Sequence, residues 1–244
     1  AIDDKGPAIA TIYALAAARA ALESSGIEPR NAIVLLFGTD EESDWMDMTT
    51  YVQHHQLPAS GFSPDGDFPV VNNEKGILAL RLSSTQKTTS MLRSARGGIR
   101  SNVVPAHAEA DIVPPREHRE AIARVLMQCQ EEDGFTVRTI SDADHILVTV
   151  DGRPAHASTP GKGRNAIGKL LAVLDTAGVL EGLSMLQSIA RSVGTDWTGH
   201  GLEVDFHDAE SGSLTLNLGV LDWVDGSGTL DVDIRYPVTS TREA

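Results

Sequence analysis

Hydrophobic patterning predicts two differently organised regions that meet near residue 76. In the first region, an Ala-rich segment at 7–25 predicts a helix, with a proline in its first turn and Gly26 after its end. Apolar residues cover nearly all its faces, so we expect this helix to be buried. The continuous apolar run at 32–37 predicts a parallel strand covered on both sides. A helix at 45–55 and a strand at 68–71 complete a doubly wound α/β pattern.

The second region has short strands and helices in a different order. The pattern predicts strands at 77–82, 109–113, 136–140, 145–150, 214–221 and 228–235, and helices at 115–131, 165–177 and 180–191. The last two strands alternate apolar and polar residues, as strands with one solvent-facing side do. We therefore expect a domain at 1–75 with a mostly parallel sheet. A second domain, at 76–244, is expected to be α+β, with an antiparallel sheet and helices on one face.

Composition and charge narrow the classes of function. The chain of 244 residues carries 34 acidic and 20 basic side chains, a formal charge of −14. Nucleic-acid binding and adhesion to anionic membranes need clustered Lys and Arg, so both are disfavoured. The single cysteine, Cys129, excludes an internal disulfide and a thiolate zinc site. We expect a protein of the reducing cytoplasm that acts on a small substrate.

Carboxylates occur in three turns of the first region. Asp3 precedes the first helix, Glu41 and Glu42 follow the apolar run, and Asp65 lies in a Ser-Pro-Asp turn. If the sheet is parallel, these turns meet at one edge, where converging oxygen donors can bind divalent cations. The alternative is that the acidic turns are solvated and cap helices.

The second candidate site is a loop around His156 that contains three glycines and two prolines and leads into a helix capped near Asn165. A histidine held in such a loop can donate a hydrogen bond to a developing oxyanion, although most histidines have no such role. The sequence contains no His-Glu-x-x-His, no Cys-x-x-Cys, no Gly-x-Ser-x-Gly and no phosphate loop. Covalent catalysis by serine or cysteine is therefore disfavoured.

These segments resemble one family when they are read in order. They are Ile2-Asp-Asp-Lys-Gly-Pro7, Gly38-Thr-Asp-Glu-Glu-Ser43, Gly61-Phe-Ser-Pro-Asp65, Asn72-Asn-Glu-Lys-Gly76, Ser101-Asn-Val-Val-Pro105, the His156 loop and Asp233-Ile-Arg-Tyr-Pro237. In this order the chain resembles the zinc-dependent exopeptidases of the M20 clan, and within them the PepV-like dipeptidase branch. The resemblance covers essentially the whole chain.

The resemblance implies a site with two divalent metal ions, zinc first and manganese or cobalt as alternatives. Asp3 would bridge the two ions, Glu42 would bind one and Asp65 the other. Glu41 would act as the general base that takes a proton from water and passes it to the leaving amine.

The second domain would be the family's lid. There His156 and Asn102 would stabilise the tetrahedral oxyanion, and Arg235 would bind the terminal carboxylate of a peptide substrate. The remaining histidines match no ligand position and are expected to be surface or structural residues: His54, His55, His107, His118, His145, His200 and His207.

The family has two further histidine ligands, one before the Asp-Asp-Lys-Gly turn and one well after the Arg-Tyr-Pro strand. Neither region is present, so we expect a fragment that binds metal weakly and is inactive alone. Two alternatives to a dipeptidase stay open. One is another M20 activity, deacylation of N-acyl amino acids or desuccinylation, and the other is a non-catalytic interaction module. An enlarged lid favours a monomer over a homodimer.

Overall fold

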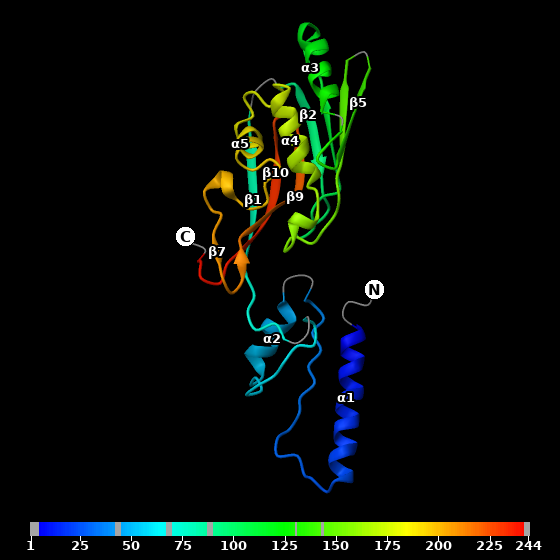
Figure 1. Cartoon of the computed structure of the whole chain (residues 1–244), viewed down its shortest axis with the longest axis vertical. Helices are drawn as coiled ribbons and strands as arrows, with labels where there is room; N and C mark the ends of the chain where they lie inside the picture. The colour runs from blue at the N-terminus through cyan, green and yellow to red at the C-terminus, as the bar shows by residue number, and fades with distance from the viewer. Residues whose placement is uncertain are drawn as a thin grey trace. The chain divides into compact units, whose positions relative to one another are not determined.

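A computed structural model describes residues 5–41, 45–66, 70–86, 90–129, 131–142 and 144–241 of the chain (Figure 1). Contacts divide the chain into two compact units, Ala1–Asn72 and Asn73–Ala244, here called unit 1 and unit 2. No described helix is both long and apolar enough to cross a membrane.

The described part of unit 1 contains the helices α1 (Lys5–Ser24) and α2 (Met46–His54). Both helices lie where the sequence predicts them. The expectation that the first helix is buried is wrong, because α1 has no buried residue and Tyr13 is 73% exposed. An all-round apolar helix loses water only where other elements cover it, and no described residue covers α1 closely enough to bury a side chain.

The prediction of a strand at 32–37 is also wrong. These residues form no strand, and Ile33 and Phe37 are 69% and 55% exposed. A strand needs a neighbour for its N–H and C=O groups, and no described residue pairs with this run. The described residues of unit 1 therefore contain no parallel sheet, and the predicted strand at 68–71 lies partly outside them.

Unit 2 is built on an eight-stranded sheet with the order β1-β10-β9-β2-β3-β6-β5-β4. Its strands are β1 (Gly76–Thr85), β2 (Leu92–Gly97), β3 (His107–Ile112), β4 (Glu131–Glu132), β5 (Phe135–Ser141), β6 (Ile146–Asp151), β9 (Thr215–Val224) and β10 (Ser227–Tyr236). All neighbouring strands pair antiparallel. A separate short hairpin joins β7 (His207–Asp208) to β8 (Gly212–Ser213).

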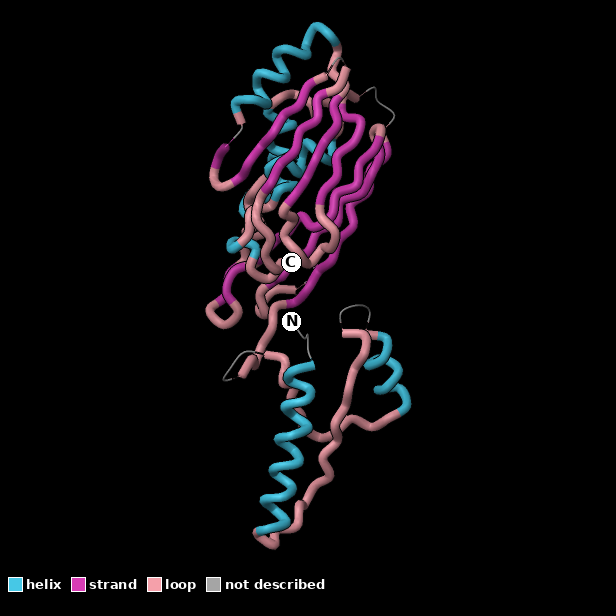
Figure 2. The backbone as a smooth tube through the Cα atoms, turned by 90° about the vertical axis from the view of Figure 1, so that its right-hand side faces the viewer, coloured by secondary structure: helices cyan, strands magenta, loops and turns pink. Residues whose placement is uncertain are grey.

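The helices of unit 2 lie on one face of this sheet, as Figure 2 shows. They are α3 (Arg116–Gln128), α4 (Ala166–Thr176) and α5 (Ser184–Ser192), with the short 3₁₀ helices η1 (Pro160–Lys162) and η2 (His200–Leu202). α4 packs across β3, β6 and β9, α3 packs on β5, and α5 packs on α4. The predicted α+β arrangement is confirmed.

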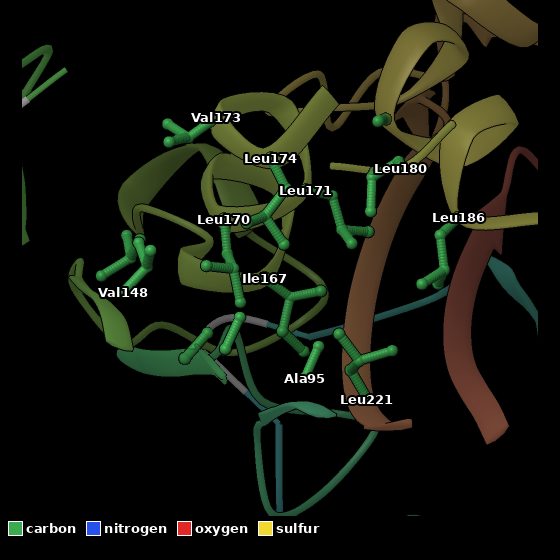
Figure 3. Close-up of a cluster of buried hydrophobic side chains, with 14 of the residues drawn as sticks. Ala95, Val148, Ile167, Leu170, Leu171, Val173, Leu174, Leu180, Leu186 and Leu221 are labelled. Atoms are coloured by element: carbon green, nitrogen blue, oxygen red, sulfur yellow. The ribbon is translucent and has the colours of Figure 1, made fainter. Parts of the chain in front are cut away.

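Burial along the strands explains why the helices occupy that face. In β6 the buried residues Ile146, Val148 and Val150 alternate with half-buried ones, so one face carries the apolar side chains. Figure 3 shows Ile167 of α4 pointing toward Ala95 of β2 and Leu221 of β9. Removing this apolar surface from water is the main stabilising term for unit 2.

The pattern misses one central strand, β2. This strand has the sequence Leu92-Arg-Ser-Ala-Arg-Gly97. Its pairing with β3 shifts register between Leu92 and Ser94, which breaks the two-residue period of buried side chains. Two arginines and three small residues further weaken the strand pattern. The sheet is therefore larger than the sequence indicates.

The β7–β8 hairpin bonds to the chain just before β1 and just after β10, at the outer edge of the sheet. Asp208 accepts hydrogen bonds from Ser211 N (2.5 Å), Ser211 Oγ (2.9 Å) and Thr239 N (3.2 Å), and Lys75 donates to Ser213 O. The bond from Ser211 N–H is the main reason why the pKa of Asp208 lies well below its usual value. The hairpin thus fixes the chain just before β1 and just after β10.

Candidate active-site residues

The turn that carries Glu41 is held in place by α2. Asp47 Oδ2 accepts hydrogen bonds from Thr39 N (2.5 Å) and Asp40 N (3.1 Å), and Asp40 Oδ2 accepts from Met46 N (2.9 Å). The bond from Thr39 N–H is the main cause of a lowered pKa at Asp47. Asp40 and Asp47 therefore stabilise the turn through hydrogen bonds, so the acidic residues of this segment do not all have the same role.

Glu41 lies in the same turn with an exposed side chain, and Asp65 is likewise exposed in the Ser-Pro-Asp turn. Neither carboxylate forms a hydrogen bond or ion pair with any described residue. The other two predicted ligands, Asp3 and Glu42, lie outside the described residues. Within the described ranges, no group of three His, Cys, Asp or Glu side chains is arranged to hold a metal ion.

In unit 2, Asn102 and His156 belong to two segments that pair with each other. Val103 and His156 form an antiparallel bridge, and Ala157 N donates to Asn102 O at 2.9 Å. Val104 N donates to Ala155 O at 2.8 Å on the other side of the bridge. These bonds place Asn102 beside the His156 loop although 54 positions separate them in the sequence.

The imidazole of His156 is oriented by Ser158. Ser158 N donates to Nδ1 at 3.2 Å, and Ser158 Oγ lies 2.7 Å from the same nitrogen. Because Nδ1 accepts the backbone N–H, the neutral ring carries its proton on Nε2. The exposed ring therefore presents an N–H donor, which an oxyanion-stabilising residue requires.

Arg235 is held by a buried carboxylate on its own strand. Its Nε and one Nη atom donate to Asp233 at 2.7 and 3.2 Å, and Asp233 is only 3% exposed. This bidentate pair uses one edge of the guanidinium and leaves the Nη1–Nη2 edge for a second carboxylate. Across the sheet Arg235 faces Thr215, whose Oγ1 lies 3.4 Å from Ala157 O. The structure thus pairs the segments that carry Asn102 and His156, and Arg235 lies one strand pairing away from them, opposite Thr215.

Two buried side chains of this region were not identified from the sequence. Asn217 of β9 and Asp233 of β10 are paired across the sheet, and both are buried. Asn217 bonds to the 101–103 segment and to Asn165. The available signal was a polar side chain inside a strand of leucines, since buried polar groups in such strands need specific partners. Asn165 is confirmed as the N-cap of α4, accepting from Gly168 N at 3.0 Å.

A cavity of about 380 Å³ lies beside the loop that follows His156. Pro160, Arg164 and Trp197 contribute to its wall, with Asp133, Asp196, Leu216, Leu218 and neighbouring backbone. Arg164 donates to Asp133 O and Gly163 O at 2.9 Å each, so its guanidinium helps to build the wall.

The remaining histidines are exposed, as predicted, and several pair with carboxylates. These pairs are His107 with Asp151 (2.7 Å), His145 with Asp111 (2.8 Å) and His200 with Asp205 (2.9 Å). In unit 1, His54 Nδ1 lies 2.9 Å from Thr50 O and His55 stacks on Tyr51. These contacts are surface contacts.

The antiparallel sheet with helices on one face is consistent with a peptidase dimerisation domain. Residues 143–222 match the family model of the M20 peptidase dimerisation domain. The chain is 35% identical over 248 residues to "Putative dipeptidase YtjP" of Bacillus subtilis, covering 98% of this chain and 52% of that protein. It is 29% identical over 244 residues to "Putative dipeptidase SAUSA300_1697" of Staphylococcus aureus, covering 97% and 51%.

These matches confirm the resemblance to the M20 peptidases that the sequence motifs indicate. The chain spans about half the length of the curated relatives it matches.

Proposed function

We propose that the protein to which this chain belongs is a metal-dependent dipeptidase of the PepV-like branch, with unit 2 as its lid. The observation that carries the proposal is the pairing of the Asn102 and His156 segments, with Arg235 clamped by Asp233 in the same unit, in a chain whose residues 143–222 match the M20 dimerisation domain. The names of the two relatives support the same substrate class.

Each of the three lid residues has a chemical role that its contacts support. The Nε2–H of His156 and the amide of Asn102 donate hydrogen bonds to the oxygen that becomes negative when water adds to the peptide carbonyl. The second edge of Arg235 binds the C-terminal carboxylate of a dipeptide, because a planar guanidinium pairs with a carboxylate through two parallel bonds. Specificity for short substrates would follow from this clamp.

M20 peptidases generally use divalent metal ions. In this chain Asp3, Glu42 and Asp65 would hold two such ions, which supply charge to polarise the carbonyl and lower the pKa of water. The exposed carboxylates of Asp65 and Glu41 fit an oxygen-donor site. Glu41 accepts the proton from the attacking water and delivers it to the leaving amine. Zinc is the first candidate, with manganese and cobalt as alternatives.

The proposal is tested on the complete protein with a panel of dipeptides, N-acyl amino acids and N-succinyl amino acids. We expect turnover of dipeptides that a chelator abolishes and zinc or manganese restores. Glu41→Gln should lower kcat by about 10²- to 10⁴-fold, the range of general acid–base catalysis. Preferred turnover of an acyl or succinyl substrate would identify another M20 amidohydrolase instead. Lack of turnover of every substrate would favour an interaction module.

A matched variant separates the proposed base from its neighbours. Asp40→Asn changes an adjacent carboxylate that bonds to Met46 N and should cost far less activity than Glu41→Gln. If Glu41→Gln kept kcat within a few-fold of the parent, Glu41 would not be the general base.

Oligomeric state and location are further parts of the proposal. An enlarged lid favours a monomer over a homodimer, and the cytoplasm is the proposed compartment. Light scattering on the complete protein after size-exclusion chromatography distinguishes the two masses directly.

A further inference from the structure

We infer that Asn217 is a positioning residue that holds Asn102 and His156 in place for catalysis. The inference rests on the proposed function, since it concerns the two residues assigned there to the oxyanion. Asn217 would not touch the substrate and would act through backbone groups of the 101–103 segment.

The side chain of Asn217 is 1% exposed and uses both amide hydrogens on this segment. Its Nδ2 donates to Ser101 O at 2.8 Å and to Val103 O at 3.0 Å. These two carbonyls flank Asn102, so a single amide fixes the backbone on both sides of the proposed oxyanion donor. The backbone of residue 102 is thereby restrained by a group that belongs to the rigid sheet.

The restraint continues from Asn102 to His156. The carbonyl of Asn102 accepts the N–H of Ala157, and Val103 bridges His156. A shift of the 101–103 segment would therefore move the backbone that carries the imidazole. Both proposed donors depend on the same anchor, because their positions are coupled by these bonds.

Asn217 is itself oriented by a second buried amide. Asn165 Nδ2 donates to Asn217 Oδ1 at 2.9 Å and to Leu218 O at 2.9 Å, while Asn165 Oδ1 caps α4. With its oxygen committed to Asn165, the Asn217 side chain must turn its NH₂ group toward Ser101 and Val103. The amide orientation is thus determined by the network, and a buried network of this kind favours one conformation.

The backbone around Asn217 leaves no room for a different path of the segment. A Cβ on Gly219 would lie 2.4 Å from Ser101 Cα, and one on Gly98 would lie 1.8 Å from Gly219 O. Gly98 also has a φ of +75°, which favours glycine. The close approach of the β9 backbone at Gly219 and the hydrogen bonds of Asn217 therefore both hold residues 98–103 in the same place.

The decisive experiment is a double-mutant cycle in the complete, metal-loaded protein. Asn217→Asp keeps the shape of the side chain and removes both N–H donors. We expect it to lower kcat for a dipeptide about 10- to 100-fold and to leave KM within about three-fold, as for loss of an interaction made in the transition state. On a background that lacks both proposed donor side chains, Asn102→Ala combined with His156→Ala, the same change should cost less than about three-fold, because both of its routes are gone.

Leu126→Ala in α3 is the matched control for stability alone. Leu126 is fully buried, and α3 packs on β5 and α4 rather than on the two loops. This variant should lower Tm, because it leaves a cavity in the core, and keep kcat within about two-fold. An unchanged kcat in Asn217→Asp, or the same loss of kcat on both backgrounds, would overturn the inference.

Hydrogen exchange in the parent protein gives a second test that needs no activity. Anchoring by Asn217 predicts slow exchange of the Ala157 N–H and of the Asn217 side-chain NH₂. Rapid exchange of these groups would overturn the inference even if the variant failed to fold. A parent protein that turns over no dipeptide, but protects these groups, would refute the proposed function and leave the structural anchor intact.

Discussion

The two units differ in how far their apolar side chains are buried. In unit 2 the apolar side chains of the sheet and of α4 are buried against each other. In unit 1 no described residue is buried, although α1 and the run at 32–37 are as apolar as core segments. Folding is stabilised by apolar surface removed from water, so unit 2 carries its own stability and unit 1, in this chain, does not.

The comparison also separates two groups among the residues proposed to be functional. Asn102, His156 and Arg235 are held by bonds within unit 2. Glu41 and Asp65 lie in exposed turns, and only the Glu41 turn is braced, by Asp47. The proposed donors of unit 2 are therefore preorganised by these bonds, whereas the side chains of Glu41 and Asp65 have no such bond to a described residue.

Separate expression of the two units should show the largest difference. Residues 73–241 should unfold in one cooperative thermal transition, because their core is closed. Residues 1–72 should melt gradually, with helical signal from α1 and α2 but no sharp transition. Circular dichroism and calorimetry measure both. A cooperative transition in residues 1–72 would show that unit 1 has a core of its own.

The fold of unit 2 was largely predictable from the sequence, and the reason is its closed core. Strands such as β6 show the two-residue period because one face is buried, and α4 shows a capped apolar helix for the same reason. β2 was missed because its register shift and its arginines hide that period. The apolar run at 32–37 led to a wrong prediction, because such a run forms a strand only where another strand is present to pair with it.

The candidate site was only partly predictable. The motifs identify Asn102, His156 and Arg235, but they do not contain the bonds that join them. Asn217 donates to a backbone carbonyl more than 100 residues away in the sequence. Asp233 accepts from Arg235, two positions further along the same strand. Such partners follow from the register of β9 and β10, which local patterns do not specify.

Truncation of matched leucines should give the next largest effect. Leu170 of α4 is fully buried, whereas Leu36 of unit 1 is 41% exposed. We expect Leu170→Ala to lower the free energy of unfolding by about 2–5 kcal/mol. Leu36→Ala should change it by less than about 0.5 kcal/mol, the usual range for surface substitutions. Urea unfolding of this chain measures both values. Similar losses would mean that residues 32–37 are packed in solution.

Glycine substitutions test the same contrast at the backbone. Gly219→Ala places a methyl group against Ser101, and overpacking of this kind costs about 1–3 kcal/mol. A methyl group added at Gly61 of unit 1 would meet no heavy atom within 4 Å, so Gly61→Ala should be neutral or slightly stabilising. Thermal unfolding compares the two variants. A neutral Gly219→Ala would contradict the close approach of β9 to the 98–103 segment.

The smallest expected effect is a pH dependence on the sheet face opposite the helices. The hydrogen bond to Asp111 is the main reason why the pKa of His145 is raised, and the charges of Asp111, Asp142 and Asp144 raise it further. A raised pKa in the folded state means that folding binds a proton. The contribution is therefore fully present below the ordinary histidine pKa of about 6.5 and is lost as the pH rises through the higher folded value.

The Tm difference between the parent chain and His145→Gln should consequently shrink between about pH 6 and pH 9, by a modest amount because the pair is exposed. On an Asp111→Asn background that pH dependence should be weaker, since its main cause is removed. A difference that grew with pH would have the wrong sign for a histidine stabilised in its charged form. A pH dependence that stayed the same without Asp111 would instead point to Asp142 and Asp144, which approach His145 from its own turn.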